Sequence, residues 1–199
     1  FAFNQFNTLF QLYAMKKAGD PALEMADTML FMPDLLAYFL TGKKGVEYTI
    51  ASTSQLLDPR TRNWSEEVFD RLGLPKKLMG KIERPGALRG TLLPNIAKEC
   101  GVDEIPVYCV GGHDTASAVA AVPAKGEDFA YLSSGTWSLL GVLSDEPKCD
   151  VAVLDAGYTN EGAVDGSIRL LKNIMGLWII QECKREWDRR ADAVGFAEL

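Results

Sequence analysis

Apolar residues recur at helical spacing in two segments near the start of the chain, residues 6–18 and 21–42. We expect Pro33 to interrupt the second helix and Gly42 to end it, because proline lacks the amide that a helix interior needs and glycine commonly ends helices. Ser65 is positioned to cap a further short helix, which a Gly-Leu-Pro sequence stops. Helices are therefore predicted to dominate the first hundred residues.

The pattern becomes strand-like further along the chain. The apolar run 105–110 is too short for a helix and ends at two glycines, which predicts a buried strand. The small residues 114–122 predict a helix that packs closely against that strand and stops at Pro123. Two β-prone runs, 129–134 and 137–142, predict a hairpin that opens a new domain.

The end of the chain adds a second predicted β region and a helix. Residues 151–171 form a glycine-broken β-prone stretch, and 175–187 fit a helix with one largely apolar face. We take the linker to lie at 125–128, which divides the chain into residues 1–126 and 127–199. The mixture of helices and strands predicts an α/β protein.

Composition narrows the functional classes. Hydrophobic residues make up 47% of the 199-residue chain, enough for a packed core. The net charge of -6, with no basic block, argues against nucleic acid or an anionic membrane as partner. Four scattered cysteines fit neither a zinc site nor a disulfide scaffold. No signal segment or membrane-length apolar run occurs, so the cytoplasm is the expected location.

Asp114 is the first candidate for chemistry. It follows a glycine turn at the predicted start of a helix, where unpaired N–H groups favour negative charge, although aspartate at such a place often only caps the helix. The adjacent His113 is the only histidine of the chain, which argues against a metal phosphohydrolase built on several histidines. A Ser-His-Asp hydrolase is also disfavoured, because the chain has no Gly-x-Ser-x-Gly sequence.

Other polar positions are open to two interpretations. The segment 133–136 could turn backbone amides and hydroxyls toward a phosphate, or form an ordinary hairpin turn. Asn173 and Gln181 have the character of solvent-facing polar residues beside an apolar helix face. Neither a P-loop nor a Rossmann glycine fingerprint is present, so those nucleotide sites are not supported.

The order of several sequence segments favours the functional interpretation of these residues over the structural one. Taken together they resemble the FGGY carbohydrate kinases, and within that family the rhamnulokinase subfamily, to which the last segment is rather specific. The resemblance spans nearly the whole chain. The matching segments are residues 5–12, 32–42, 51–57, 112–119, 133–141 and 169–178.

This resemblance implies the ribonuclease-H-like fold of actin, Hsp70 and the sugar kinases, in which ATP and sugar lie between two domains. Residues 1–126 would be the later, sugar-binding part of domain I, and 127–199 the beginning of the ATP-binding domain II. Asp114 would be the general base. The implied ligand contacts are His113, Asp114, Thr115 and Asn173 for the sugar, and Thr136 and Gln181 for ATP.

The implied reaction is the ATP- and Mg²⁺-dependent phosphorylation of the 1-hydroxyl of L-rhamnulose. The chain contains no counterpart of the family's N-terminal phosphate-binding hairpin or of its C-terminal adenosine-binding segment, and it begins without methionine. It therefore resembles a piece of a longer kinase, inactive alone, whose unpaired strand edges favour self-association. The alternatives are an FGGY kinase for another ketose, such as fuculose or xylulose, and a non-catalytic actin-like remnant.

Overall fold

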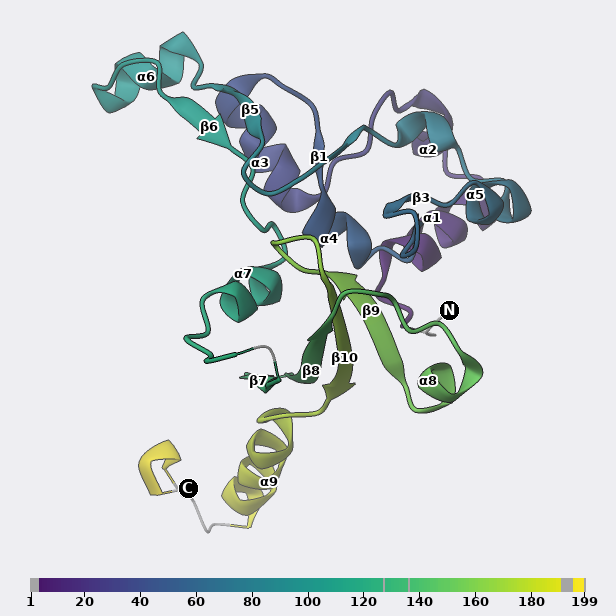
Figure 1. Ribbon diagram of the computed structural model, residues 1–199, viewed down its shortest axis with the longest axis vertical. Helices are drawn as coiled ribbons and strands as arrows, with labels where there is room; N and C mark the ends of the chain where they lie inside the picture. The colour runs from purple at the N-terminus through teal and green to yellow at the C-terminus, as the bar shows by residue number, and fades with distance from the viewer. Residues whose placement is uncertain (1–3, 127, 136, 191–194, 199) are drawn as a thin grey trace.

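The computed structural model describes residues 4–126, 128–135, 137–190 and 195–198 of the chain. In this part, an N-terminal unit contains helices and three two-stranded sheets, and a second unit is built on a four-stranded sheet (Figure 1). The helices are α1 (Thr8–Lys17), α2 (Ala22–Met25), α3 (Met32–Thr41), α4 (Tyr48–Ser52), α5 (Glu66–Leu72), α6 (Pro94–Cys100), α7 (Asp114–Ala120), α8 (Val151–Asp155) and α9 (Trp178–Arg189), with 3-10 helices η1 (Lys76–Leu78) and η2 (Phe196–Glu198). The strands are β1 (Val46–Glu47), β2 (Leu57–Asp58), β3 (Asn63–Trp64), β4 (Ile82–Glu83), β5 (Leu88–Thr91), β6 (Pro106–Tyr108), β7 (Ala130–Ser134), β8 (Ser138–Ser144), β9 (Tyr158–Gly162) and β10 (Ile168–Ile174).

The hydrophobic core of the N-terminal unit lies between α1, α2, α5 and η1. Leu9 and Leu12 of α1 pack there with Leu56, Phe69 and Leu78, all of them buried. Burying an aliphatic or phenyl side chain of this size contributes about 1.5–3 kcal/mol. Two of the apolar residues at helical spacing in the first segment, Leu9 and Leu12, therefore serve this core.

Helix ends in this unit follow the glycine and proline signals, with one correction. The expectation that Pro33 interrupts a helix is wrong, because Pro33 lies in the first turn of α3, where its missing amide costs nothing. The chain instead leaves helical geometry between Met25 and Met32. Gly42 ends α3, as predicted, and the structure shows that it does so in the left-handed conformation. Ser65 occupies the N-cap position of α5 but makes no side-chain capping hydrogen bond.

The predicted sequence of strand, glycine turn and helix is present as β6, Gly111-Gly112 and α7. The strand is not buried, however, because β6 pairs only with β5 in a two-stranded sheet and leaves Tyr108 exposed. The helix α7 packs mainly against β7 of the second unit instead of against β6. The expectation of a buried strand covered by this helix is therefore wrong.

The second unit is an antiparallel sheet in the order β7-β8-β10-β9. The predicted hairpin is confirmed by the pairing of β7 with β8, in which Ser134 lies opposite Ser138. The predicted β region from residue 151 is wrong over its first part, since residues 151–155 form α8. Asp150 caps this helix by accepting a hydrogen bond from the Val153 amide at 2.9 Å, which favours helix over strand at this point.

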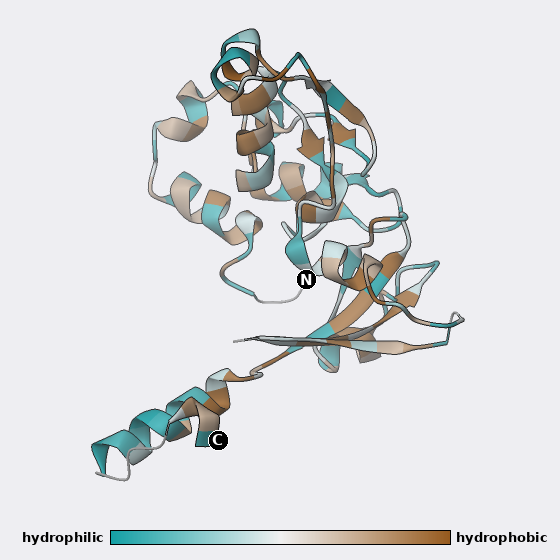
Figure 2. Cartoon of the chain, turned by 90° about the vertical axis from the view of Figure 1, so that its left-hand side faces the viewer, coloured by the Kyte–Doolittle hydropathy of each residue, from teal (hydrophilic) through white to brown (hydrophobic). Residues whose placement is uncertain are grey.

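The helix α9 follows the sheet and extends away from it (Figure 1). It begins at Trp178, three residues later than the pattern predicts, and contains no buried residue. Figure 2 shows that it is hydrophilic over most of its length. In the described residues, no helix is both long and apolar enough to span a membrane.

The two units meet where α4 packs against β9. The amide of Gly162 in β9 donates to the Ser52 hydroxyl of α4 at 2.7 Å, and Gly162 lies directly against the ring of Tyr48. A side chain at position 162 would overlap that ring. This contact brings the sheet edge next to the segment that carries His113 and Asp114.

Candidate functional site

The Gly111-Gly112 turn places the backbone before Asp114 in close contact with the N-terminal unit. A Cβ atom added at Gly112 would lie 3.1 Å from the Glu47 carboxylate and 3.3 Å from Pro33 Cβ. Both distances are tighter than ordinary van der Waals contact, so glycine allows the peptide to approach the buried carboxylate. A side chain at position 112 would therefore need Glu47 and Pro33 to shift by a few tenths of an ångström.

Glu47 is a buried carboxylate that organises this region. Its Oε2 accepts hydrogen bonds from the Gly112 amide (2.9 Å), the Thr49 hydroxyl (2.6 Å) and the Ile50 amide (3.2 Å), and its Oε1 accepts from the Thr49 amide (2.8 Å). The Thr49 hydroxyl oxygen in turn accepts from the His113 amide at 3.1 Å. The Gly112 and His113 amides therefore each donate a hydrogen bond to a side chain at the start of α4, which fixes the backbone of residues 112 and 113.

A buried ion pair lies behind Glu47. Asp34 of α3 accepts from the Glu47 amide at 3.1 Å and from the Arg89 guanidinium at 2.9 Å, and both side chains of the ion pair are buried. Burial raises the pKa of Asp34, against the opposing effect of the Arg89 hydrogen bond and charge. The network therefore runs from β5 through α3 and β1 to the turn before Asp114.

Asp114 itself is open to solvent, with 97% of its side chain exposed. It is the first residue of α7, and His113 occupies the N-cap position, so the alternative of Asp114 as the N-cap residue does not hold. Its Oδ1 accepts from the amide of the buried Thr115 at 2.7 Å and lies 3.4 Å from the Thr115 hydroxyl. The carboxylate is oriented by its neighbour and is accessible to a ligand hydroxyl.

His113 is held by the second unit. Its Nδ1 lies 2.8 Å from Nη2 of Arg169 on β10 and 3.3 Å from Oε2 of Glu161 on β9, and its Nε2 lies 3.7 Å from Oδ1 of Asp114. Burial alone would raise the pKa of Glu161, but the charge and hydrogen bonds of the neighbouring side chains, Arg169 among them, outweigh burial and lower it. The charged cluster thus joins the two units at the candidate site.

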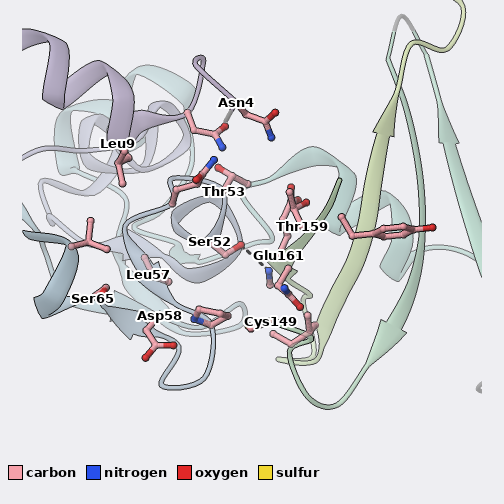
Figure 3. A pocket seen from close by; sticks show the side chains of 18 of the residues that line it. Asn4, Leu9, Ser52, Thr53, Leu57, Asp58, Ser65, Cys149, Thr159 and Glu161 are labelled. Atoms are coloured by element: carbon pink, nitrogen blue, oxygen red, sulfur yellow. Dashed lines mark hydrogen bonds between the residues drawn. The ribbon is translucent and has the colours of Figure 1, made fainter. Parts of the chain in front are cut away.

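A cavity of about 920 Å³ lies between the N-terminal unit and the sheet, and His113 and Asn173 are among the residues that line it. In Figure 3, Ser52 and Thr53 lie on one side, and Thr159 and Glu161 of β9 lie on the other. Asp114 and Thr115 are not among the lining residues. The structure therefore brings His113 and Asn173 to one cavity and leaves the carboxylate beside it.

The residues expected to contact ATP are less closely associated with this cavity. Gln181 lies in α9, beyond the sheet, and its backbone N–H donates to the Leu177 carbonyl at 3.1 Å within the first turn of the helix. Thr136 lies outside the described residues. Beside it, the Gly135 amide donates to the Trp137 carbonyl at 2.8 Å, so this amide is engaged within the hairpin turn.

Sequence reasoning did not identify four residues of the site. Glu47 and Thr49 were missed because 65 residues separate Glu47 from Gly112, and no local pattern links them. Arg169 and Glu161 were missed because alternation in a strand predicts which face a residue occupies, not its partner in another unit. In the described part of the chain, no three His, Cys, Asp or Glu side chains are grouped closely enough to hold a metal ion.

The chain matches both domains of one family of known proteins. Residues 2–121 match the N-terminal domain of the FGGY family of carbohydrate kinases, and residues 130–199 match the C-terminal domain of that family. The chain is 50% identical over 182 residues to a rhamnulokinase of Bacteroides thetaiotaomicron, covering 92% of this chain and 38% of that protein. It is 43% identical over 197 residues to a rhamnulokinase of Oceanobacillus iheyensis, covering 99% of this chain and 42% of that protein.

Solved structures show the same fold. A ligand-bound xylulose kinase of Lactobacillus acidophilus superposes with a TM-score of 0.76 at 21% identity, covering 92% of this chain and 36% of that one. A Plasmodium falciparum glycerol kinase with ADP gives 0.73 at 17% identity, covering 92% and 38%. The chain thus has the α/β fold of the sugar kinases and spans about two fifths of the length of the rhamnulokinases it matches. Because the two domains of the family match residues 2–121 and 130–199, the chain belongs to the FGGY family of carbohydrate kinases.

Proposed function

We propose that the complete protein containing this sequence phosphorylates the 1-hydroxyl of L-rhamnulose with ATP, in the cytoplasm. The support is the similarity of nearly the whole chain to proteins named rhamnulokinase, at 50% and 43% identity. Within that protein, residues 1–126 would complete the sugar-binding domain I, and residues 127–199 would begin the ATP-binding domain II.

The accessible carboxylate of Asp114 is the observation that carries the proposed mechanism. As the 1-hydroxyl oxygen forms its bond to the γ-phosphorus of ATP, Asp114 accepts the hydroxyl proton, and the bond from that phosphorus to the β,γ-bridging oxygen breaks to release ADP. One hydrogen bond from the Thr115 amide orients Asp114 through Oδ1, and the exposed side chain leaves room for the substrate. A positioned base of this kind contributes about 10²–10⁴ to the rate.

The remaining contacts complete the proposed assignment. His113 and Asn173 would bind sugar hydroxyls at the cavity that both line, and Thr115, next to Asp114, would also contact the sugar. Thr136 and Gln181 would contact ATP from the sheet side. Mg²⁺ would be held together with the nucleotide and would neutralise charge on the phosphates.

A substrate panel tests this proposal. ADP release by the complete protein would be followed in a coupled assay with L-rhamnulose, L-fuculose and D-xylulose at matched concentrations. We expect the highest kcat/KM for L-rhamnulose. Preference for another ketose would reject the substrate while retaining the kinase, and no turnover of any of the three would support a non-catalytic protein.

A further inference from the structure

The contacts of His113 impose a choice between two arrangements of its ring protons. Nδ1 lies close to a donor, Arg169 Nη2, and to an acceptor, Glu161 Oε2. A guanidinium can only donate, and a carboxylate can only accept. Nδ1 therefore either accepts from Arg169 or carries a proton and donates to Glu161, but it cannot do both.

The distances favour the first arrangement. The contact from Arg169 Nη2 is 2.8 Å, a good hydrogen-bond length, whereas the contact to Glu161 Oε2 is 3.3 Å. The same Nη2 lies 2.9 Å from Glu161 Oε2, so its two hydrogens can serve one acceptor each. The proximity of Nδ1 to Glu161 then follows from a shared donor and needs no bond of its own.

Arg169 is rigidly placed for this role. Its side chain is fully buried, at 0% exposure, and its Nε donates to the Gly162 carbonyl at 3.0 Å. Gly162 is the residue that packs against Tyr48 at the junction of the two units. The guanidinium is thus fixed to the sheet edge that faces the His113 ring.

We propose that Arg169 is a positioning residue that holds His113 as the neutral tautomer protonated at Nε2. This assignment deepens the proposed function and rests on it for its catalytic meaning. The protonated Nε2 lies on the Asp114 side of the ring, 3.7 Å from Oδ1, which is too long for a hydrogen bond, so its N–H group is available to donate to a sugar oxygen. The imidazole lone pair is used by Arg169, so Asp114 alone is free to take the hydroxyl proton.

The tautomer is directly measurable because His113 is the only histidine in the 199 residues. The chain would be produced with ¹⁵N-labelled histidine, and a long-range ¹H–¹⁵N correlation spectrum recorded at mildly alkaline pH, where an unperturbed imidazole is neutral. We expect a pyrrole-like Nε2 and a pyridine-like Nδ1. A pyrrole-like Nδ1 in the unmodified chain would overturn the proposal.

Two variants separate the contribution of each partner. Glu161→Gln retains the Arg169 donor and is expected to keep the Nε2–H tautomer, so a switch in this variant would also contradict the proposal. Arg169→Met removes the donor and is expected to shift the proton to Nδ1, facing Glu161; a folded variant that keeps Nε2–H would exclude Arg169 from this role. If Arg169→Met does not fold, the unmodified chain and Glu161→Gln still decide the assignment.

Failure of this inference is distinguishable from failure of the proposed function. The tautomer is read from nitrogen shifts, which require no turnover. A kinase assay in which Asp114→Asn has no effect would reject the proposed base and leave the tautomer result unchanged. Conversely, a pyrrole-like Nδ1 would reject the role of Arg169 even in an active kinase.

Discussion

Substitution of Glu47 by glutamine tests whether this buried carboxylate holds the turn before Asp114. The side chain accepts four hydrogen bonds, three at Oε2 and one at Oε1. The side-chain amide of glutamine has one acceptor oxygen and one NH₂ group that can only donate. Its most favourable placement keeps the oxygen at the Oε2 position and turns the NH₂ group toward the backbone N–H of Thr49.

The magnitude follows from that placement. The Thr49 amide loses its acceptor in a buried position, which costs about 1–3 kcal/mol. The remaining three bonds lose their charge assistance, but removing the charge also removes the cost of burying a carboxylate, so these two effects largely offset each other. We expect the free energy of unfolding to fall by about 2 kcal/mol, which lowers the melting temperature by about 4–8 °C for a chain of this size.

The assay is urea and thermal unfolding of the chain, followed by circular dichroism. Glu99→Gln, an identical change at an exposed position on α6, is the matched control and is expected to have no measurable effect. If Glu47→Gln unfolds at the same urea concentration and temperature as Glu99→Gln, the hydrogen bonds around Glu47 do not hold the turn.

Three further predictions follow from the junction between the units and from the length of the chain. Gly162→Ala places a methyl group against the Tyr48 ring and is expected to destabilise the fold by about 1–3 kcal/mol, measured as a shift in the urea midpoint; an unshifted midpoint would mean that the junction can relax. The pKa of Glu161 is lowered from 4.5, so its stabilising contribution is complete above that value and is lost as the pH falls through the lowered pKa. The melting temperature should therefore fall more steeply on acidification in the unmodified chain than in Glu161→Gln, and parallel curves would exclude this contribution. Finally, we expect the 199-residue chain by itself to show no kinase activity with L-rhamnulose and ATP, and ADP release above background would prove this wrong.

Local signals in the sequence were informative where a single residue determines the backbone. Gly42 ends α3 in the left-handed conformation, and the β7–β8 hairpin forms at the predicted place. Pro33 was misread because the same residue that breaks a helix interior is well suited to a first turn, and the pattern alone did not fix where the helix begins. The stretch starting at Val151 was misread because the capping side chain of Asp150 outweighs a β-prone composition.

The candidate site was predictable only in part. The resemblance pointed to the segment that contains Asp114, and the structure shows that this carboxylate is exposed at the start of α7. The supports of this segment come from distant positions: Glu47 and Thr49 hold its backbone, and Arg169 holds His113. Such contacts depend on how the two units meet, which periodicity along one strand or helix does not encode.

The most direct test of the proposed function is the effect of Asp114→Asn on turnover of L-rhamnulose by the complete protein. Asp103→Asn, the same change at an exposed position in the loop between α6 and β6, serves as the matched control. We predict that Asp114→Asn lowers kcat by about 10²–10⁴ with little change in the KM for ATP, while Asp103→Asn leaves both unchanged. A kcat for Asp114→Asn equal to that of the control would contradict the assignment of Asp114 as the base.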